Sequence, residues 1–224
     1  MTTPSAKAMR QIVQDTVPLF KDAGFRKRRH GFNREVQAGM VHVVSFQMGP
    51  YEPPGADEIP PFRINLYGKF AVNLGVYVPE MVFENWQVPK GWVNETQCQL
   101  RKRLGELVTA GASDLWWSLD EPSAASSDVA DALSVHGLPW LERFLSRADL
   151  LREFRSEGRF ALGMAPRGPL EIAWLLADSD RATAESVVRE YLREDLSPPH
   201  REWLQKILAT KGFDHLTQDD AVAE

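Results

Sequence analysis

The 224-residue sequence contains one cysteine, no long hydrophobic run and none of the short motifs that mark common enzyme sites. The lone Cys98 excludes a disulfide within the chain and a cysteine-based zinc site. No segment approaches the ~18 continuous apolar residues of a membrane span. The N-terminal residues lack the apolar run of a signal peptide. We therefore expect a cytoplasmic protein that has no membrane partner.

Signals of catalysis are also missing. The sequence has no Gly-x-Gly-x-x-Gly, no phosphate-binding loop, no His-Glu-x-x-His and no Gly-x-Ser-x-Gly. His42 falls in a predicted strand, which favours a hydrogen-bonded side chain over a metal ligand or a base. Cys98 begins a predicted helix whose dipole would lower a thiol pKa, but a small buried side chain is the default for a lone cysteine. We expect no catalytic residue, no metal site and no cofactor.

The composition is that of a globular protein, with 43% hydrophobic and 25% charged residues. Seven Trp and eleven Phe supply ample apolar surface for a core. The net charge of −5 is uneven, because residues 1–110 carry +4 and residues 111–224 carry −9. An acidic C-terminal half argues against a nucleic-acid partner for the whole chain.

The clearest structural pattern is Phe62 to Val78, where nearly every even position is apolar. This period of two predicts a strand with one buried face and one mixed or wet face. Because 17 residues is long for one strand, Gly68 is expected to mark a bend between two shorter strands. The second half, Phe70 to Val78, is predicted to be the central strand, and Phe62 to Lys69 an edge strand or one arm of a hairpin.

The rest of the chain predicts an α+β fold: an N-terminal helix packed on a mostly antiparallel sheet, then helices, and a small all-helical C-terminal appendage. Glycines and prolines between Gly158 and Pro169 suggest a boundary. We predict an α+β domain over 1–157, a helical appendage over 158–213 and a polar tail over 214–224. The predicted helices are 5–23, 97–108, 128–146, 148–156, 170–177, 181–193 and 199–210, and the predicted strands include 32–36 and 41–48.

Two sets of side chains are candidates for binding. The basic run Arg26 to His30 could bind phosphate or an acidic protein surface, but a solvated strand edge is the favoured interpretation. The second set lies on the non-core face of the predicted sheet and on the helix 97–108, where Arg101 and Arg103 would point to different sides. Its members are Gln47, Asn73, Tyr77, Arg101 and Arg103.

Five motifs in a fixed order resemble the bacterial family known as domain of unknown function 4304, over about residues 5–150. They are Gly24-Phe25 through Arg34, Val43 to Gln47, Phe70 to Glu80, Cys98 to Leu107 and Trp116 to Leu119. The resemblance implies a shared α+β fold and a cytoplasmic bacterial setting. It names no catalytic residue and no activity.

These observations favour a non-catalytic binding protein whose partner is another protein. A toxin-neutralising, immunity-like role fits by analogy with other small acidic α+β proteins. The alternative is an enzyme or small-ligand binder with a pocket between sheet and helices. A deep pocket where the candidate side chains converge would favour this alternative, and a flat face would favour a protein partner. The oligomeric state stays open.

Overall fold

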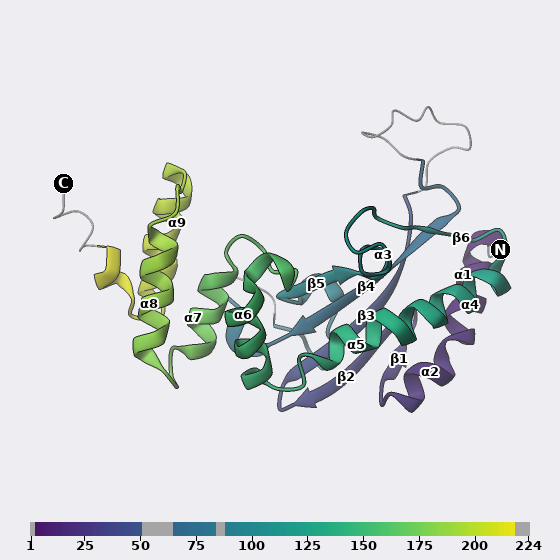
Figure 1. Cartoon of the computed structure of the whole chain (residues 1–224), viewed down its shortest axis with the longest axis horizontal. Helices are drawn as coiled ribbons and strands as arrows, with labels where there is room; N and C mark the ends of the chain where they lie inside the picture. The colour runs from purple at the N-terminus through teal and green to yellow at the C-terminus, as the bar shows by residue number, and fades with distance from the viewer. Residues whose placement is uncertain (1–2, 51–64, 84–87, 218–224) are drawn as a thin grey trace.

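The computed structural model describes residues 3–50, 65–83 and 88–217, and it shows an α+β fold as predicted (Figure 1). In this part of the chain the strands form an antiparallel sheet in the order β1-β2-β3-β4-β5, and β6 pairs with β4. The strands are β1 (Arg26–Arg28), β2 (Gly31–Gln37), β3 (Met40–Met48), β4 (Lys69–Tyr77), β5 (Leu100–Arg103) and β6 (Trp117–Ser118).

The helices cover one face of the sheet and extend beyond its β5 edge (Figure 1). The α-helices are α1 (Pro4–Asp15), α2 (Val17–Asp22), α3 (Leu104–Val108), α4 (Pro122–Ala132), α5 (Leu138–Glu142), α6 (Arg147–Ala161), α7 (Gly168–Leu176), α8 (Arg181–Leu192) and α9 (Pro198–Ala209). Short turns of 3₁₀ helix are η1 (Pro79–Met81), η2 (Glu95–Gln97) and η4 (Asp214–Thr217), and a π-helical turn, η3 (Leu133–Gly137), joins α4 to α5.

The main core lies between the sheet and the N-terminal helices. Phe20 of α2 stacks on Phe32 of β2, with ring centroids 4.0 Å apart. Phe70 of β4 continues this aromatic layer toward Trp117 of β6, at 6.0 Å. The even residues of β4 are fully buried here, which confirms the predicted core face of this strand.

The opposite face of β4 is more buried than the sequence predicts. Asn73 and Tyr77 were expected on a mixed or wet face, yet each is only 5% exposed. The reason is a covering segment, residues 88–99, that crosses this face of the sheet. Val93 and Cys98 of that segment pack with Tyr77 in a second, smaller hydrophobic cluster.

The predicted helix over 97–108 is wrong in its first half. Residues 100–103 form β5, which pairs with β4, and α3 begins only at Leu104. Leucines at 100, 104 and 107 fit a helical period, but Leu100 is buried by its pairing with Val76. Arg101 and Arg103 therefore lie on one face of a strand, not on different sides of a helix.

The first half of the long apolar pattern also differs from the prediction. Among the described residues 65–68 there is no strand, and Gly68, with φ of +69°, lies in a turn before β4. Glycine suits this left-handed conformation because it has no Cβ. Residues 62–64 lie outside the described part of the chain, together with residues 51–61, a proline-rich stretch that we expect to form an exposed loop.

Two helix boundaries differ from the predictions. The predicted helix over 5–23 is two helices, α1 and α2, that meet at Thr16, because Pro18 removes a backbone donor. Helix α4 begins at Pro122 instead of near residue 128, because proline suits the first turn of a helix. Its small residues also let it pack against α1, where Ser126 donates a hydrogen bond to Asp15 at 2.9 Å.

The C-terminal helices match the predicted spacing, and they pack closely on the rest of the chain. The stretch predicted as a boundary runs beside β5, where the amide of Arg101 donates to the carbonyl of Gly163 at 3.0 Å. Trp174 of α7 contacts Phe83, with ring centroids 5.2 Å apart. Leu216 is buried, so residues 214–217 pack as a turn and do not fray. Independent folding of 158–213 stays a prediction.

His42 is a buried, hydrogen-bonded strand histidine, as the sequence favours. Its Nε2 donates to the carbonyl of Phe144 at 2.8 Å, and its Nδ1 accepts from Arg34 at 3.1 Å. Burial lowers the pKa of His42 to about 4, so the ring is neutral near pH 7. Arg34 also forms an ion pair with Glu142 at 2.5 Å, which ties β2 to the end of α5.

Candidate functional site

The candidate site lies on the face of the sheet opposite the N-terminal helices. Strand pairing places one residue from each of five strands in a single row across this face. The row is Arg28, Gly31, Ser45, Asn73 and Arg103, in the order β1 to β5. Directly paired residues point their side chains to the same face. The row therefore has an arginine at each end and small or polar residues between them.

The neighbouring row on the same face repeats this arrangement. It runs Arg26, Asn33, Val43, Gly75 and Arg101, again from β1 to β5. Together the two rows form a trough. Its two edges carry arginines, and its floor consists of residues with shorter side chains. We call this surface the arginine trough.

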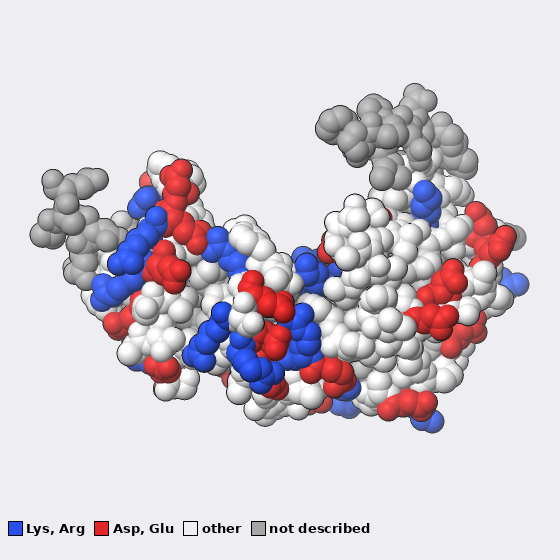
Figure 2. Space-filling view, viewed as in Figure 1, with Lys and Arg blue, Asp and Glu red and all other residues white. Residues whose placement is uncertain are grey.

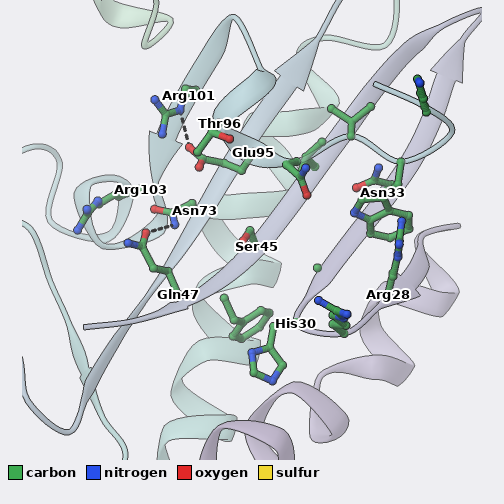
Figure 3. Close-up of a pocket in the computed structure, with 18 residues that line it drawn as sticks. Arg28, His30, Asn33, Ser45, Gln47, Asn73, Glu95, Thr96, Arg101 and Arg103 are labelled. Carbon is green, nitrogen blue, oxygen red and sulfur yellow. Dashed lines mark hydrogen bonds and ion pairs between the residues drawn. The ribbon is translucent and has the colours of Figure 1, made fainter. Parts of the chain in front are cut away.

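The covering segment closes one side of the arginine trough and gives it depth. The resulting cavity has a volume of about 660 Å³, and Lys90, Trp92 and Thr96 of the covering segment line it. This volume is in the range of small-ligand sites. Figure 3 shows Arg101 and Arg103 at one end of the cavity, Arg28 at the other and Ser45 between them.

The β1 end of the trough carries uncompensated positive charge. No carboxylate in the described ranges forms an ion pair with Arg28, Arg29 or Lys90, all of which line the cavity and are exposed. The guanidinium of Arg28 lies 5.9 Å from the ring centroid of Trp92. This contact holds the arginine by a cation–π interaction and leaves its donors available to a ligand.

The β5 end is rich in hydrogen-bond donors, but its charge is balanced. Arg101 Nε donates to Glu95 at 2.5 Å, and Arg103 forms an ion pair with Asp114 at 2.7 Å. Glu95 is held in η2, and its hydrogen bond raises the pKa of Arg101. A guanidinium has five N–H donors, so one carboxylate contact leaves others unused.

The floor between the two ends is polar and hydrogen-bonded. Asn73 donates to Gln47 at 2.9 Å, as the dashed line in Figure 3 marks. Ser45 lies beside Asn73 and is partly exposed. The buried oxygen of Asn33 has no hydrogen-bond partner in the described part of the chain. Buried polar atoms of this kind are normally paired, so the Asn33 oxygen is an exception at the floor of the trough.

Two titratable side chains near the trough are neutral at pH 7. Burial, with the nearby charges of Lys27 and Arg10, lowers the pKa of His30 at the rim. Burial also raises the pKa of Cys98 well above its usual value. Cys98 follows a 3₁₀ turn and does not begin a helix, so the predicted effect of a helix dipole on its thiol is wrong. It packs as the small buried side chain expected by default.

Four of the five candidate residues meet at this site. Gln47, Asn73, Arg101 and Arg103 line the same cavity. Tyr77 instead lines a separate, adjoining cavity of about 380 Å³, and burial raises its pKa. Roles of these residues in binding stay predictions.

Several lining residues escaped the sequence analysis. Ser45 lies two residues from both Val43 and Gln47, so the period of the strand alone places it on their face. Lys90, Trp92 and Glu95 belong to a segment without regular period, and only its packing on the sheet brings them to the site. The basic run did indicate Arg28 and Arg29, but the sequence did not show which residues of other strands lie beside them.

The face seen in Figure 2 carries charges of both signs. In the view of Figure 2, basic and acidic side chains intermix over α6 and the C-terminal helices.

Within the described residues, no group of three or more His, Cys, Asp and Glu is arranged to hold a metal ion. No helix in the described part of the chain has the length and apolar character needed to cross a membrane.

The fold and the site define an α+β protein with a basic cavity on an open sheet face. Residues 62–143 match the family model described as Domain of unknown function (DUF4304). This match confirms the family resemblance for part of the chain, including β4, β5 and both helices α4 and α5. Comparisons with curated proteins and with solved structures give no match.

Proposed function

We propose that this protein is a non-catalytic binding protein that holds an anionic ligand in the arginine trough. The observation that carries the proposal is the pair of cross-strand rows, each with an arginine at both ends. Arginine forms strong, charge-assisted hydrogen bonds with phosphate and carboxylate groups. The chain has a net charge of −5, so this basic cavity is a local exception to its overall charge.

The geometry supports binding of a ligand better than contact with a flat partner. Gln47, Asn73, Arg101 and Arg103 converge on a cavity of about 660 Å³. This convergence favours the small-ligand alternative that the sequence left open. The predicted pocket was between the sheet and the helices, whereas the cavity lies between the sheet and the covering segment. The toxin-neutralising role rests on analogy alone and stays a prediction.

The anion would bind at the β1 end. The charges of Arg28, Arg29 and Lys90 are not offset by carboxylates in the described residues, so an anion placed there would interact with several cations at once. Such exposed charges are screened by salt, with a Debye length of about 8 Å at physiological ionic strength. Binding should therefore weaken as salt is raised.

A titration with inorganic phosphate at constant ionic strength, followed by amide NMR signals, tests the proposal. We expect shifts concentrated at the β1 end of the trough, at residues such as Arg28, Gly31 and Lys90. Arg28→Glu reverses one charge of the β1 end without breaking an ion pair among the described residues. It should weaken phosphate binding by about tenfold or more, which corresponds to about 1.4 kcal/mol.

The matched control is Arg193→Glu, which makes the same change at an exposed arginine that follows α8. This variant should bind phosphate within about twofold of the unmodified chain. Shifts scattered over other basic surfaces, or equal binding by the two variants, would contradict the proposal.

A further inference from the structure

The two ends of the arginine trough differ in a way that restricts the ligand. At the β1 end, Arg28, Arg29 and Lys90 have no ion-pair partner in the described ranges. At the β5 end, Glu95 and Asp114 balance the two arginines. A second anionic group at the β5 end would have to compete with these carboxylates. A neutral group that accepts hydrogen bonds would use the free guanidinium donors without this competition.

The region between the two ends also favours a polar ligand. Ser45, Asn73 and Gln47 offer a hydroxyl and amides along the floor. An apolar ligand would cover these groups without replacing their hydrogen bonds to water, which costs free energy. Hydroxyl groups both donate and accept, so they suit this mixture of side chains.

The width of the sheet indicates how long the ligand is. Four strand spacings separate β1 from β5, and at about 4.8 Å each they place these backbones roughly 19 Å apart. Arginines line the cavity at both of these ends, so the ligand lies within this span. The row has no bulky side chain between its arginines, because Gly31, Ser45 and Asn73 fill it.

We propose that the ligand is a small polyhydroxylated molecule with one anionic group, a phosphate or a carboxylate, of the sugar phosphate or sugar acid class. The anionic group lies against Arg28, Arg29 and Lys90. The hydroxyl groups lie over Ser45 and Asn73 and accept hydrogen bonds from Arg101 and Arg103. This inference rests on the proposed binding of anions in the trough.

Calorimetric titrations of the full chain with matched probes test the inference. The probes are inorganic phosphate, glucose 6-phosphate, hexyl phosphate, glucose and glucuronate. We expect glucose 6-phosphate to bind at least about tenfold more tightly than inorganic phosphate or hexyl phosphate, and glucose to bind more weakly than any anion. Glucuronate separates the two head groups: binding tighter than that of glucose 6-phosphate assigns a carboxylate, and weaker binding assigns a phosphate.

Ser45→Leu provides a test that leaves every charge in place. Its larger apolar side chain fills the floor, so it should remove the advantage of glucose 6-phosphate over inorganic phosphate. Ser45→Ala keeps the floor open and should retain most of that advantage. Thermal unfolding of both variants shows whether the sheet is intact, and if Ser45→Leu fails to fold, the probe series on the unmodified chain still decides.

The outcomes separate the inference from the proposed function. If inorganic phosphate binds in the trough and glucose 6-phosphate binds no better, the inference is wrong and the proposed function stands. If hexyl phosphate binds as tightly as glucose 6-phosphate, the hydroxyl groups of the ligand do not contribute to binding, and that part of the inference is wrong. If no anion in the series binds, the proposed function itself is wrong. Tight binding of a glutamate-rich peptide, with none of the small probes, would replace the small ligand with an acidic protein segment.

Discussion

Glu171 is a buried carboxylate in α7 with only one charged contact. Its side chain is 2% exposed, and one oxygen accepts from Arg167 at 3.2 Å. The other oxygen has no hydrogen bond in the described part of the chain. Burial raises the pKa of Glu171 from 4.5 to about 7, and the nearby Arg167 offsets only part of this effect.

This raised pKa predicts a pH-dependent stability. The folded state favours the protonated acid, so its contribution is fully present below pH 4.5 and is lost as pH rises through about 7. The difference between the two pKa values corresponds to about 3 kcal/mol. Glu171→Gln should raise the free energy of unfolding by about 1–3 kcal/mol at pH 8 and leave it nearly unchanged at pH 4.5. Urea unfolding at several pH values measures this difference.

A comparison of variants is needed because His42 acts in the opposite direction. Its folded pKa of about 4 lies below the usual 6.5, so its contribution is lost as pH falls from about 6.5 toward 4. The two slopes oppose each other in the unmodified chain. Glu190→Gln, at an exposed carboxylate on α8, is the control and should show no pH-dependent gain. An equal gain in both variants would contradict the role of burial.

At the scale of single residues, the sequence indicated most of the site residues but not their geometry. The alternation of β4 predicted the face of Asn73, and the basic run indicated Arg28. Arg101 and Arg103 were expected on different sides of a helix, and β5 places them side by side. That difference could not be predicted locally, since β5 is four residues long and owes its conformation to pairing with β4.

The covering segment and β4 pack so closely that glycine is required at residue 75. A Cβ added to Gly75 would lie 2.6 Å from the Cys98 sulfur and 2.8 Å from the Cys98 Cβ. Gly75→Ala should therefore lower the free energy of unfolding by about 1–3 kcal/mol, as overpacking typically does. Chemical denaturation measures this loss.

Two further variants separate this contact from a general effect of alanine in the sheet. Cys98→Gly removes both clashing atoms, so the double variant should lose less stability than the sum of the single variants. Gly31→Ala places a Cβ on the same face, where the nearest atom, in Trp92, is at an ordinary 3.5 Å. It should change stability by less than about 1 kcal/mol. Additive losses would show that Gly75 and Cys98 are not coupled.

Among the elements, long periodic helices and β4 were predictable, and the covering segment was not. Helices α7, α8 and α9 follow their predicted ranges within a few residues. Helices α8 and α9 each have an apolar face with a helical period, and α7 is a short apolar run that is buried on nearly all sides. The covering segment has no such period. Its conformation comes from η2 and from packing on the sheet, which no short window of sequence reveals.

At the scale of the whole molecule, the sheet and the C-terminal helices share apolar packing. Phe83 contacts Trp174 and Trp203, with centroid distances of 5.2 and 5.7 Å. Met164 forms an isolated bridge with Leu100 at the edge of the sheet. The sequence predicted a boundary at 158–169 from its glycines and prolines, but local composition carries no information about such distant contacts.

These contacts predict how the chain responds to truncation. A chain that ends at residue 157 exposes Leu100 and Phe83, which are buried in the full chain. Burial of such side chains contributes about 1.5–3 kcal/mol each, so the shortened chain should unfold at a lower temperature and be cleaved faster by protease. A chain that ends at Thr217 keeps these contacts and serves as the control, with an expected unfolding midpoint close to that of the full chain.

If the chain ending at 157 unfolded cooperatively at the midpoint of the full chain, residues 158–213 would be the independent appendage predicted from the sequence. A lower midpoint would instead mean that the edge strand β5, and with it the arginine pair at one end of the trough, depends on the C-terminal helices.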